Sequence, residues 1–238
     1  MAKAWREDCL DRLSSQASST GILRELASIV DRLGFEYCSY VLWSPLPITS
    51  PSVTWSSTYP SQWLDHYFAH NYLDTDPLIK QAARELVPVV WASAESDGGQ
   101  PEFWEEAMAH GVQHGWALAT HGKHMTTGML SLARGHEKIT ALELSEKEPQ
   151  LVWLSHVTHG LLGTTETKQA RAGVDHHLSL REIEVLRWSA EGKTADEIGT
   201  ILGISTRTVT FHITSTLTKL GATNKTQAVT KAFLFGLL

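Results

Sequence analysis

The sequence of 238 residues is poor in cysteine, with Cys9 and Cys38 as its two thiols. Two cysteines are too few for a disulfide scaffold or a thiolate metal site, so we expect a reduced, cytoplasmic protein. No stretch reaches about 18 uninterrupted apolar residues, the length of a transmembrane helix. The N-terminus also lacks the apolar segment of a signal peptide. These absences argue against secretion and against a membrane partner.

Catalytic signatures are missing as well. There is no Gly-x-Ser-x-Gly elbow and no dinucleotide-binding fingerprint. Two histidine pairs, His66/His70 and His110/His114, have the i,i+4 spacing of metal ligands, but no Glu follows the first His as in a metalloprotease. Gly111 also weakens any helix through the second pair. We therefore expect no enzyme, no metal site and no cofactor.

Negative charge disappears toward the C-terminus. The chain carries a net charge of −6, yet no acidic residue follows Glu197. The 41 residues beyond it hold four cations and form a possible phosphate-binding surface. These cations are Arg207, Lys219, Lys225 and Lys231.

The first two thirds of the chain predict an α+β domain. Short runs rich in β-branched and aromatic residues predict strands, and no regular strand–helix alternation separates them, so the sheet is antiparallel or mixed. The predicted strands are 37–43, 53–58, 115–120 and 128–133. Apolar spacing predicts helices over 22–33, 61–70, 75–86, 101–110 and 151–162, and Pro149 marks a helix start or a kink.

A polar stretch without periodicity separates this domain from the rest of the chain. We place the N-terminal domain at 1–165, a linker at 166–176 and the C-terminal domain at 177–238. The sequence of the last domain predicts four short helices, each beginning after a residue that can cap it. These residues are Ser179, Thr194, Ser205 and either Thr223 or Asn224.

The third of these helices has two contrasting faces. One is an apolar stripe of Val209, Ile213, Leu217 and Leu220, predicted to be buried. The other carries hydroxyls, cations and a Phe without any carboxylate, and a short helix and tight turn precede it, as in a helix-turn-helix. The alternative is a helical bundle whose Thr-rich face is merely polar. The candidate DNA-binding residues are Arg207, Thr208, Thr210, Phe211, Thr214 and Lys219, with Ser215 and Thr218 on the same side.

The C-terminal region resembles the DNA-binding domain of LuxR-type transcription regulators. The matching runs are Leu180-Arg-Glu-Ile-Glu-Val-Leu186, Gly192-Lys-Thr-Ala-Asp-Glu-Ile198 and Ser205-Thr-Arg-Thr-Val-Thr-Phe-His212. Phosphorelay regulators share this module, so control by a different small molecule, by phosphorylation or by another partner stays open. A receiver domain, however, needs βα alternation, which residues 1–162 do not show.

The N-terminal region resembles the acyl-homoserine-lactone receptors of the same family. The shared pattern is Tyr59-Pro-x-x-Trp63-x-x-x-Tyr67, followed by Asp76-Pro, Trp91 and Gly115. The resemblance implies an α/β/α sandwich on an antiparallel sheet, with the ligand enclosed between sheet and helices. It also implies a homodimer that binds double-stranded DNA at a palindromic promoter site.

The resemblance implies roles for single residues. Trp63 would bond the lactone carbonyl, Asp76 the amide N–H and Tyr59 the amide carbonyl. The residue chemistry agrees, since an indole only donates, a carboxylate only accepts and a phenol does either. The other expected ligand contacts are Ser131 and Ser39 near the acyl head, and Tyr67, Trp91, Trp116 and Trp104 in the walls.

Overall fold

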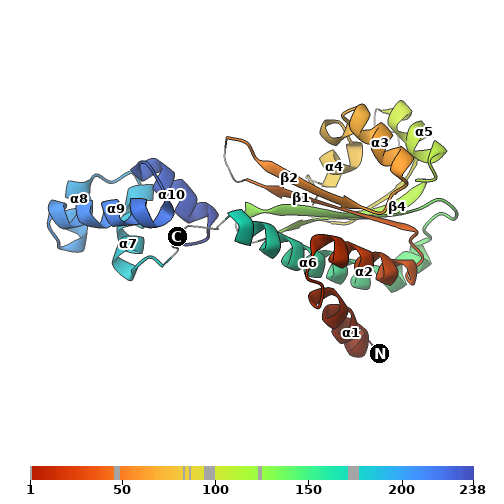
Figure 1. The fold of residues 1–238 in the computed structure, drawn as a ribbon, viewed down its shortest axis with the longest axis horizontal. Coiled ribbons are helices and arrows are strands. Elements are labelled where there is room, and N and C mark those ends of the chain that lie inside the picture. Colours follow the sequence, from red (N-terminus) through yellow and green to blue (C-terminus); the bar gives the residue numbers. More distant parts are fainter. Residues whose placement is uncertain are drawn as a thin grey trace. The chain divides into compact units, whose positions relative to one another are not determined.

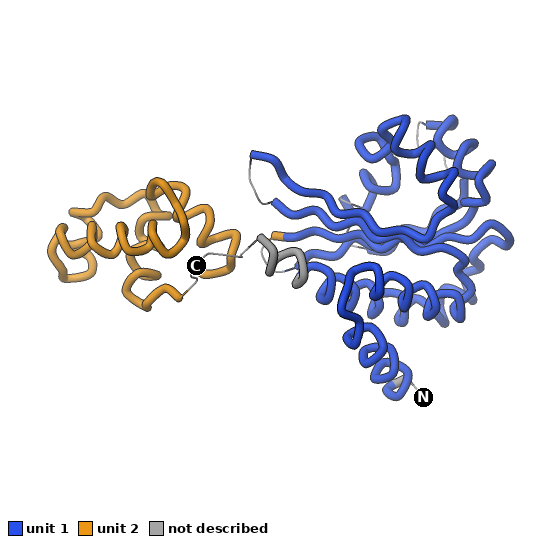
Figure 2. Tube along the Cα trace, viewed as in Figure 1, with its two compact units in different colours: residues 1–122, 126–166 blue, residues 123–125, 167–238 orange. Residues whose placement is uncertain are grey.

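The computed structural model describes residues 2–45, 49–82, 84–85, 87–93, 100–122, 125–170 and 177–238, with the backbone alone for residues 2 and 164–170. The chain divides into two compact units (Figure 2). One comprises residues 1–122 and 126–166, and the other comprises residues 123–125 and 167–238.

The first unit is built on a five-stranded sheet with the order β2-β1-β5-β4-β3. Every neighbouring pair is antiparallel. The predicted strands are confirmed as β1 (Tyr37–Ser44), β2 (Ser52–Ser57), β4 (His114–His121) and β5 (Thr127–Arg134). The edge strand β3 (Val89–Ala92) was not predicted, because four residues are too few to show an alternating pattern.

Helices cover both faces of this sheet, so the predicted α/β/α sandwich is confirmed (Figure 1). The helices α2 (Ser19–Asp31) and α6 (Ala141–Ala170) lie on one face. The other face carries α3 (Ser61–Ala69), α4 (Pro77–Ala82) and α5 (Pro101–Ala109), with the 3-10 turn η1 (Tyr72–Asp74) between α3 and α4. The N-terminal helix α1 (Ala2–Ser14) was not predicted, because it has few apolar residues with helical spacing.

The start expected for α6 is wrong. The helix begins at Ala141 and contains Pro149 in its interior. Proline removes one backbone hydrogen bond there, but the next turns of the helix are held by Leu151 and Leu154, which are fully buried against the sheet. The helix also runs to Ala170, so its last residues are helical where we expected the linker to begin.

The two faces of the sheet have different cores. The face under α2 and α6 is largely aliphatic, with Leu26, Leu130 and Leu154 completely buried. The face under α3 and α5 is aromatic and includes Trp63, Tyr67, Trp91, Phe103 and Trp104. The predicted ligand residues fall mostly in this aromatic core.

The second unit holds α7 (Leu180–Ala190), α8 (Ala195–Leu202), α9 (Thr206–Leu220) and α10 (Lys225–Leu234). The predicted caps are confirmed, and Asn224 rather than Thr223 opens α10. Gly203 and Gly221 end α8 and α9 in the left-handed conformation, as a C-terminal glycine allows. The short α8, its tight turn and the longer α9 form the predicted helix-turn-helix.

Candidate functional site

A cavity lies on the aromatic face of the sheet, with about 450 Å³ of empty space counting its mouth. It is lined by seven of the predicted ligand residues, which are Ser39, Tyr59, Trp63, Tyr67, Asp76, Trp91 and Ser131. Trp104 lines it too. The lining residues not predicted are Val41, Trp55, Leu78, Phe103, Ala107, Val112 and Met129. The cavity is therefore apolar, with a few polar groups that can orient a ligand.

Strand register arranges the sheet side of the cavity in three rows across the strands. The first, called the Trp91 row, contains Trp91, Gly115 and Ala133. The second, the Ser131 row, contains Ala117, Ser131, Ser39 and Ser57. The third, the Trp55 row, contains Met129, Val41 and Trp55. Successive rows are two residues apart, or about 6.6 Å along the strands.

Trp116 does not line the cavity, and its expected place in the wall is wrong. Side chains alternate between the faces of a strand, and a Cβ added at the neighbouring Gly115 would overlap the indole of Trp91 on the cavity side. Trp116 therefore points into the aliphatic core. Its indole N–H donates there to Glu148 Oε1 at 3.4 Å.

Tyr59 and Ser131 are joined by a hydrogen bond of 3.0 Å between their hydroxyls. Burial raises the pKa of Tyr59, so its hydroxyl keeps its proton and can donate. Ser39 is the cross-strand neighbour of Ser131. Its Oγ is buried with no hydrogen-bond partner among the residues described. The Ser131 row thus offers several hydroxyls to an acceptor oxygen.

Asp76 is buried at the start of α4 and accepts three hydrogen bonds. Tyr67 donates to Oδ2 at 2.8 Å, and the amides of Leu78 and Ile79 donate to Oδ1 at 2.8 and 3.4 Å. Burial raises the pKa of Asp76 to about 6, although these hydrogen bonds oppose the rise. A carboxylate has about four acceptor positions, so one is left for a donor in the cavity.

Three indole groups in the cavity wall lack an acceptor. The Nε1 atoms of Trp55, Trp91 and Trp104 are buried and have no partner in the described part of the chain. A buried donor left unpaired costs about 1–3 kcal/mol. A ligand that brings acceptor oxygens into this cavity would recover that free energy.

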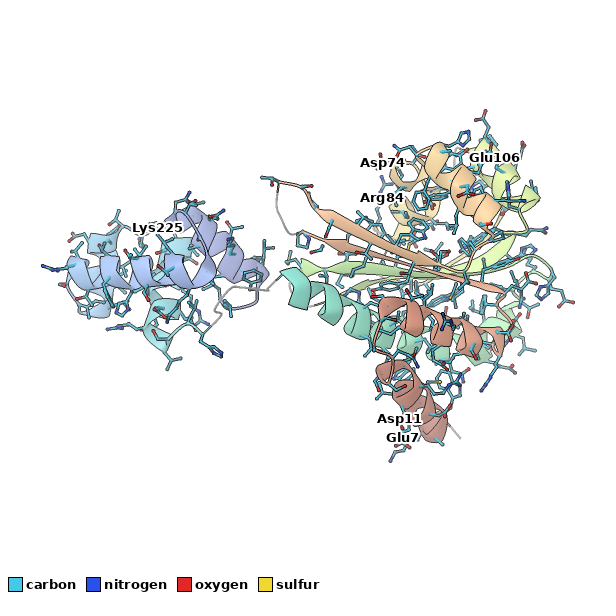
Figure 3. The ribbon with its side chains drawn as sticks, in the orientation of Figure 1. Glu7, Asp11, Asp74, Arg84, Glu106 and Lys225 are labelled. Atoms are coloured by element: carbon cyan, nitrogen blue, oxygen red, sulfur yellow. The ribbon has the colours of Figure 1, made fainter. Side chains whose placement is uncertain are left out.

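A histidine cluster lies on the outer side of Trp63. The ring centroids of His66 and His110 are 6.2 and 5.5 Å from that of Trp63. Glu106 of α5 (Figure 3) faces His66 Nε2 at 2.6 Å and accepts from Tyr72. No group of three or more His, Cys, Asp or Glu side chains in the described ranges is placed to hold a metal ion.

The exposed face of α9 carries most of the candidate DNA-binding residues. Arg207, Thr210, Phe211 and Thr214 are exposed, and Thr208 is half-buried. Phe211 has 68% of its surface exposed. Such an apolar ring on a polar helix face is available for contact with another molecule.

Lys219 and Ser215 are arranged differently from the expectation. Lys219 Nζ donates to Glu182 Oε2 at 2.8 Å, and Ser215 donates to Glu182 Oε1 at 2.6 Å. Glu182 is buried and also accepts from the amide of Ser179 in the capping box of α7. The charge of Lys219 is therefore compensated inside the domain.

Comparison with known proteins assigns both units. Residues 18–161 match the autoinducer binding domain, and residues 176–232 match the bacterial regulatory proteins of the luxR family. The chain therefore belongs to the LuxR-type quorum-sensing transcriptional regulators, with an autoinducer-binding domain and a DNA-binding domain. Its relatives are regulators and not enzymes.

The chain is similar to particular members along nearly its whole length. The transcriptional activator SolR of Ralstonia nicotianae is 39% identical, over 91% of this chain and 92% of that protein. The crystal structure of Escherichia coli SdiA superposes with a TM-score of 0.80 at 30% identity, covering 100% of this chain and 99% of that one. SdiA in complex with octanoyl-rac-glycerol gives 0.76 at 31% identity, covering 98% and 95%. No helix in the described residues has the length and apolarity needed to cross a membrane.

Proposed function

We propose that the protein binds an N-acyl-homoserine lactone in this cavity and, as a homodimer, binds a palindromic promoter site to regulate transcription. The observation that carries the proposal is the polar set around one apolar cavity. It combines a free carboxylate position on Asp76, the hydroxyls of Tyr59 and Ser131, and the indole of Trp63. This set matches the one donor and the carbonyl acceptors of an acyl-homoserine lactone.

In this arrangement the Trp63 N–H donates to the lactone carbonyl, and Asp76 accepts the amide N–H. Tyr59, supported by Ser131 and Ser39, donates to the amide carbonyl. Tyr67 holds the Asp76 carboxylate in position through its 2.8 Å hydrogen bond. Trp91 forms the wall on the lactone side, and the acyl chain extends toward the Trp55 row.

Ligand binding would control DNA binding through stability. A ligand that binds the folded state only adds RT ln(1 + [L]/Kd) to the free energy of unfolding. The stabilised protein then dimerises and presents two copies of α9 to half-sites about 10 base pairs apart. The outer faces of α6 and α10 are the candidate dimer surfaces, and Phe233 on α10 is 60% exposed.

At the DNA, Arg207 and Thr208 would bind phosphates at the start of α9. Thr210, Phe211 and Thr214 face outward along the helix and would meet base edges and thymine methyl groups. Lys219 lies at the flank of this DNA-binding surface and would contribute mostly by holding α9 in place through its hydrogen bond to Glu182.

A different acyl ligand is the second candidate. A structure of SdiA, a relative of similar fold, has been solved in complex with octanoyl-rac-glycerol. An acylglycerol has an ester carbonyl for Tyr59 and hydroxyls that could donate to Asp76, but it lacks the lactone ring. Control by phosphorylation is disfavoured, because the sheet is antiparallel and a receiver domain has parallel βα units.

The test is thermal denaturation of the full-length protein with N-octanoyl-homoserine lactone or octanoylglycerol, followed by DNA-binding assays on the same samples. We expect the lactone to raise the melting temperature and to promote dimerisation and binding to a two-half-site DNA. Tyr59→Phe should reduce the ligand shift. The matched control is Tyr40→Phe, since Tyr40 is a buried tyrosine that bonds to His159 on the other face of the sheet. A shift with octanoylglycerol alone would favour the second candidate.

A further inference from the structure

Trp55 lines the cavity in the row farthest along the strands from the Trp91 row. It lies on the edge strand β2, paired with Val41, and Val41 is paired with Met129 on β5. Its ring packs against Tyr67 and Phe68 of α3, at centroid distances of 5.0 and 5.4 Å. Two helical residues and a strand pair therefore hold the indole in place.

The indole N–H of Trp55 has no acceptor. Nε1 is buried, and no described residue accepts from it. The surrounding row offers only the side chains of Val41 and Met129, which cannot accept a strong hydrogen bond. An indole nitrogen can only donate, so the missing partner is an acceptor that enters the cavity.

The order of the rows shows which part of a lactone lies nearest. In the proposed binding mode the Trp91 row borders the lactone ring, and the Ser131 row, whose serine bonds to Tyr59, supplies the hydroxyls for the amide carbonyl. The Trp55 row follows about 6.6 Å further along the strands. The first carbons of the acyl chain therefore run from the Ser131 row toward Trp55.

We infer that Trp55 donates a hydrogen bond to an oxygen on the acyl chain, so that the preferred ligand is a lactone with an oxo or hydroxyl group at the 3-position. This inference rests on the proposed function. The third carbon is two bonds from the amide carbonyl, so its oxygen lies between the Ser131 row and the Trp55 row. An unsubstituted chain would leave the Trp55 N–H unpaired.

The other two unpaired indoles do not compete for this oxygen. Trp91 lies in the row on the far side of Ser131. Trp104 packs against Trp91 at a centroid distance of 5.5 Å. Both therefore lie on the side of the lactone ring and its oxygens.

The experiment measures the affinity of the full-length protein for N-octanoyl-, N-(3-oxooctanoyl)- and N-(3-hydroxyoctanoyl)-homoserine lactone. We expect at least one of the two oxygenated lactones to bind about tenfold more tightly than the plain one. Trp55→Phe keeps the ring packing but removes the N–H, so it should abolish this preference by weakening only the oxygenated ligand. Trp104→Phe is the matched control and should leave the preference unchanged.

Equal affinities in the wild-type protein, or a preference retained in Trp55→Phe, would overturn the inference while leaving the proposed function intact. Should Trp55→Phe not fold, Trp55→Leu provides a second removal of the donor by an apolar side chain, and the wild-type comparison stands by itself. Failure of every lactone to bind the wild-type protein would instead refute the proposed function, and the role of Trp55 with it.

Discussion

Replacing Asp76 by Asn should stabilise the unliganded protein at neutral pH while weakening its response to ligand. Burial raises the pKa of Asp76 from an ordinary 3.8 to about 6. That difference corresponds to about 3 kcal/mol. Because the folded protein binds more protons between these values, this group's contribution to the free energy of unfolding falls as the pH rises from about 4 to about 6. Above pH 6 the folded state bears the full penalty of the buried charge.

Asparagine carries no charge and can still accept from the amides of Leu78 and Ile79. We therefore expect Asp76→Asn to be more stable than wild type at pH 7.5, by up to about 3 kcal/mol. The advantage should disappear at pH 4, where the wild-type carboxyl is protonated. With lactone present the advantage of Asp76→Asn should shrink, because the ligand N–H loses a charged acceptor and binding should weaken about tenfold or more.

Urea denaturation between pH 4 and pH 7.5, followed by tryptophan fluorescence, measures this difference. Eight of the nine tryptophans lie within residues 1–165, so the signal reports on the ligand-binding unit. Asp74→Asn is the control, because Asp74 lies two residues away but is exposed (Figure 3). A stability difference between wild type and Asp76→Asn that does not change with pH would refute the reasoning.

Three further predictions follow from the structure. Although burial opposes ionisation, hydrogen bonds led by that from Lys219 lower the pKa of Glu182 to about 2, so Glu182→Gln should destabilise the DNA-binding unit by about 1–3 kcal/mol. This loss, measured by calorimetry, should be complete above pH 4.5 and should shrink as the pH falls toward 2. Gly115→Ala should destabilise the protein and abolish the ligand-induced thermal shift, because the added Cβ would overlap the indole of Trp91. Gly160→Ala is the control: the space around Gly160 is open, so this substitution should be neutral or stabilising by up to about 1 kcal/mol. Met129 lines the Trp55 row, toward which the proposed acyl chain extends, so Met129→Ala should shift the preferred lactone toward longer acyl chains in a thermal-shift panel. An unchanged optimum would contradict this placement of the acyl chain.

Much of the DNA-binding unit could be predicted because its signals are local. A capping residue and its partner are three positions apart, as in Ser179 and Glu182, so their pairing is visible in the sequence. The pairing of Glu182 with Lys219 spans 37 positions and depends on how α7 packs against α9. A helical projection therefore placed Lys219 beside the candidate DNA-binding residues without revealing its internal partner.

The ligand-binding unit shows the same contrast. The resemblance to the family named seven of the residues that line the cavity, yet it assigned Trp116 to the wrong face. The face of a strand residue depends on the phase of the strand's alternation relative to the core, and a shift of one residue reverses it. Trp55 was missed because it lies outside the pattern shared with the family and reaches the cavity through the pairing of its strand with Val41.

The sequence by itself determined the two-domain organisation and the helix-turn-helix, which follow from composition, capping and periodicity acting over a few residues. The resemblance to the family added the antiparallel order of the sheet and the residue types expected around the cavity. Only the tertiary structure decided which face each strand residue takes, how far α6 extends past Pro149, and which buried donors lack acceptors. These properties depend on register and packing between segments far apart in the chain, because a hydrogen-bond donor is satisfied or unpaired only once its neighbours are in place.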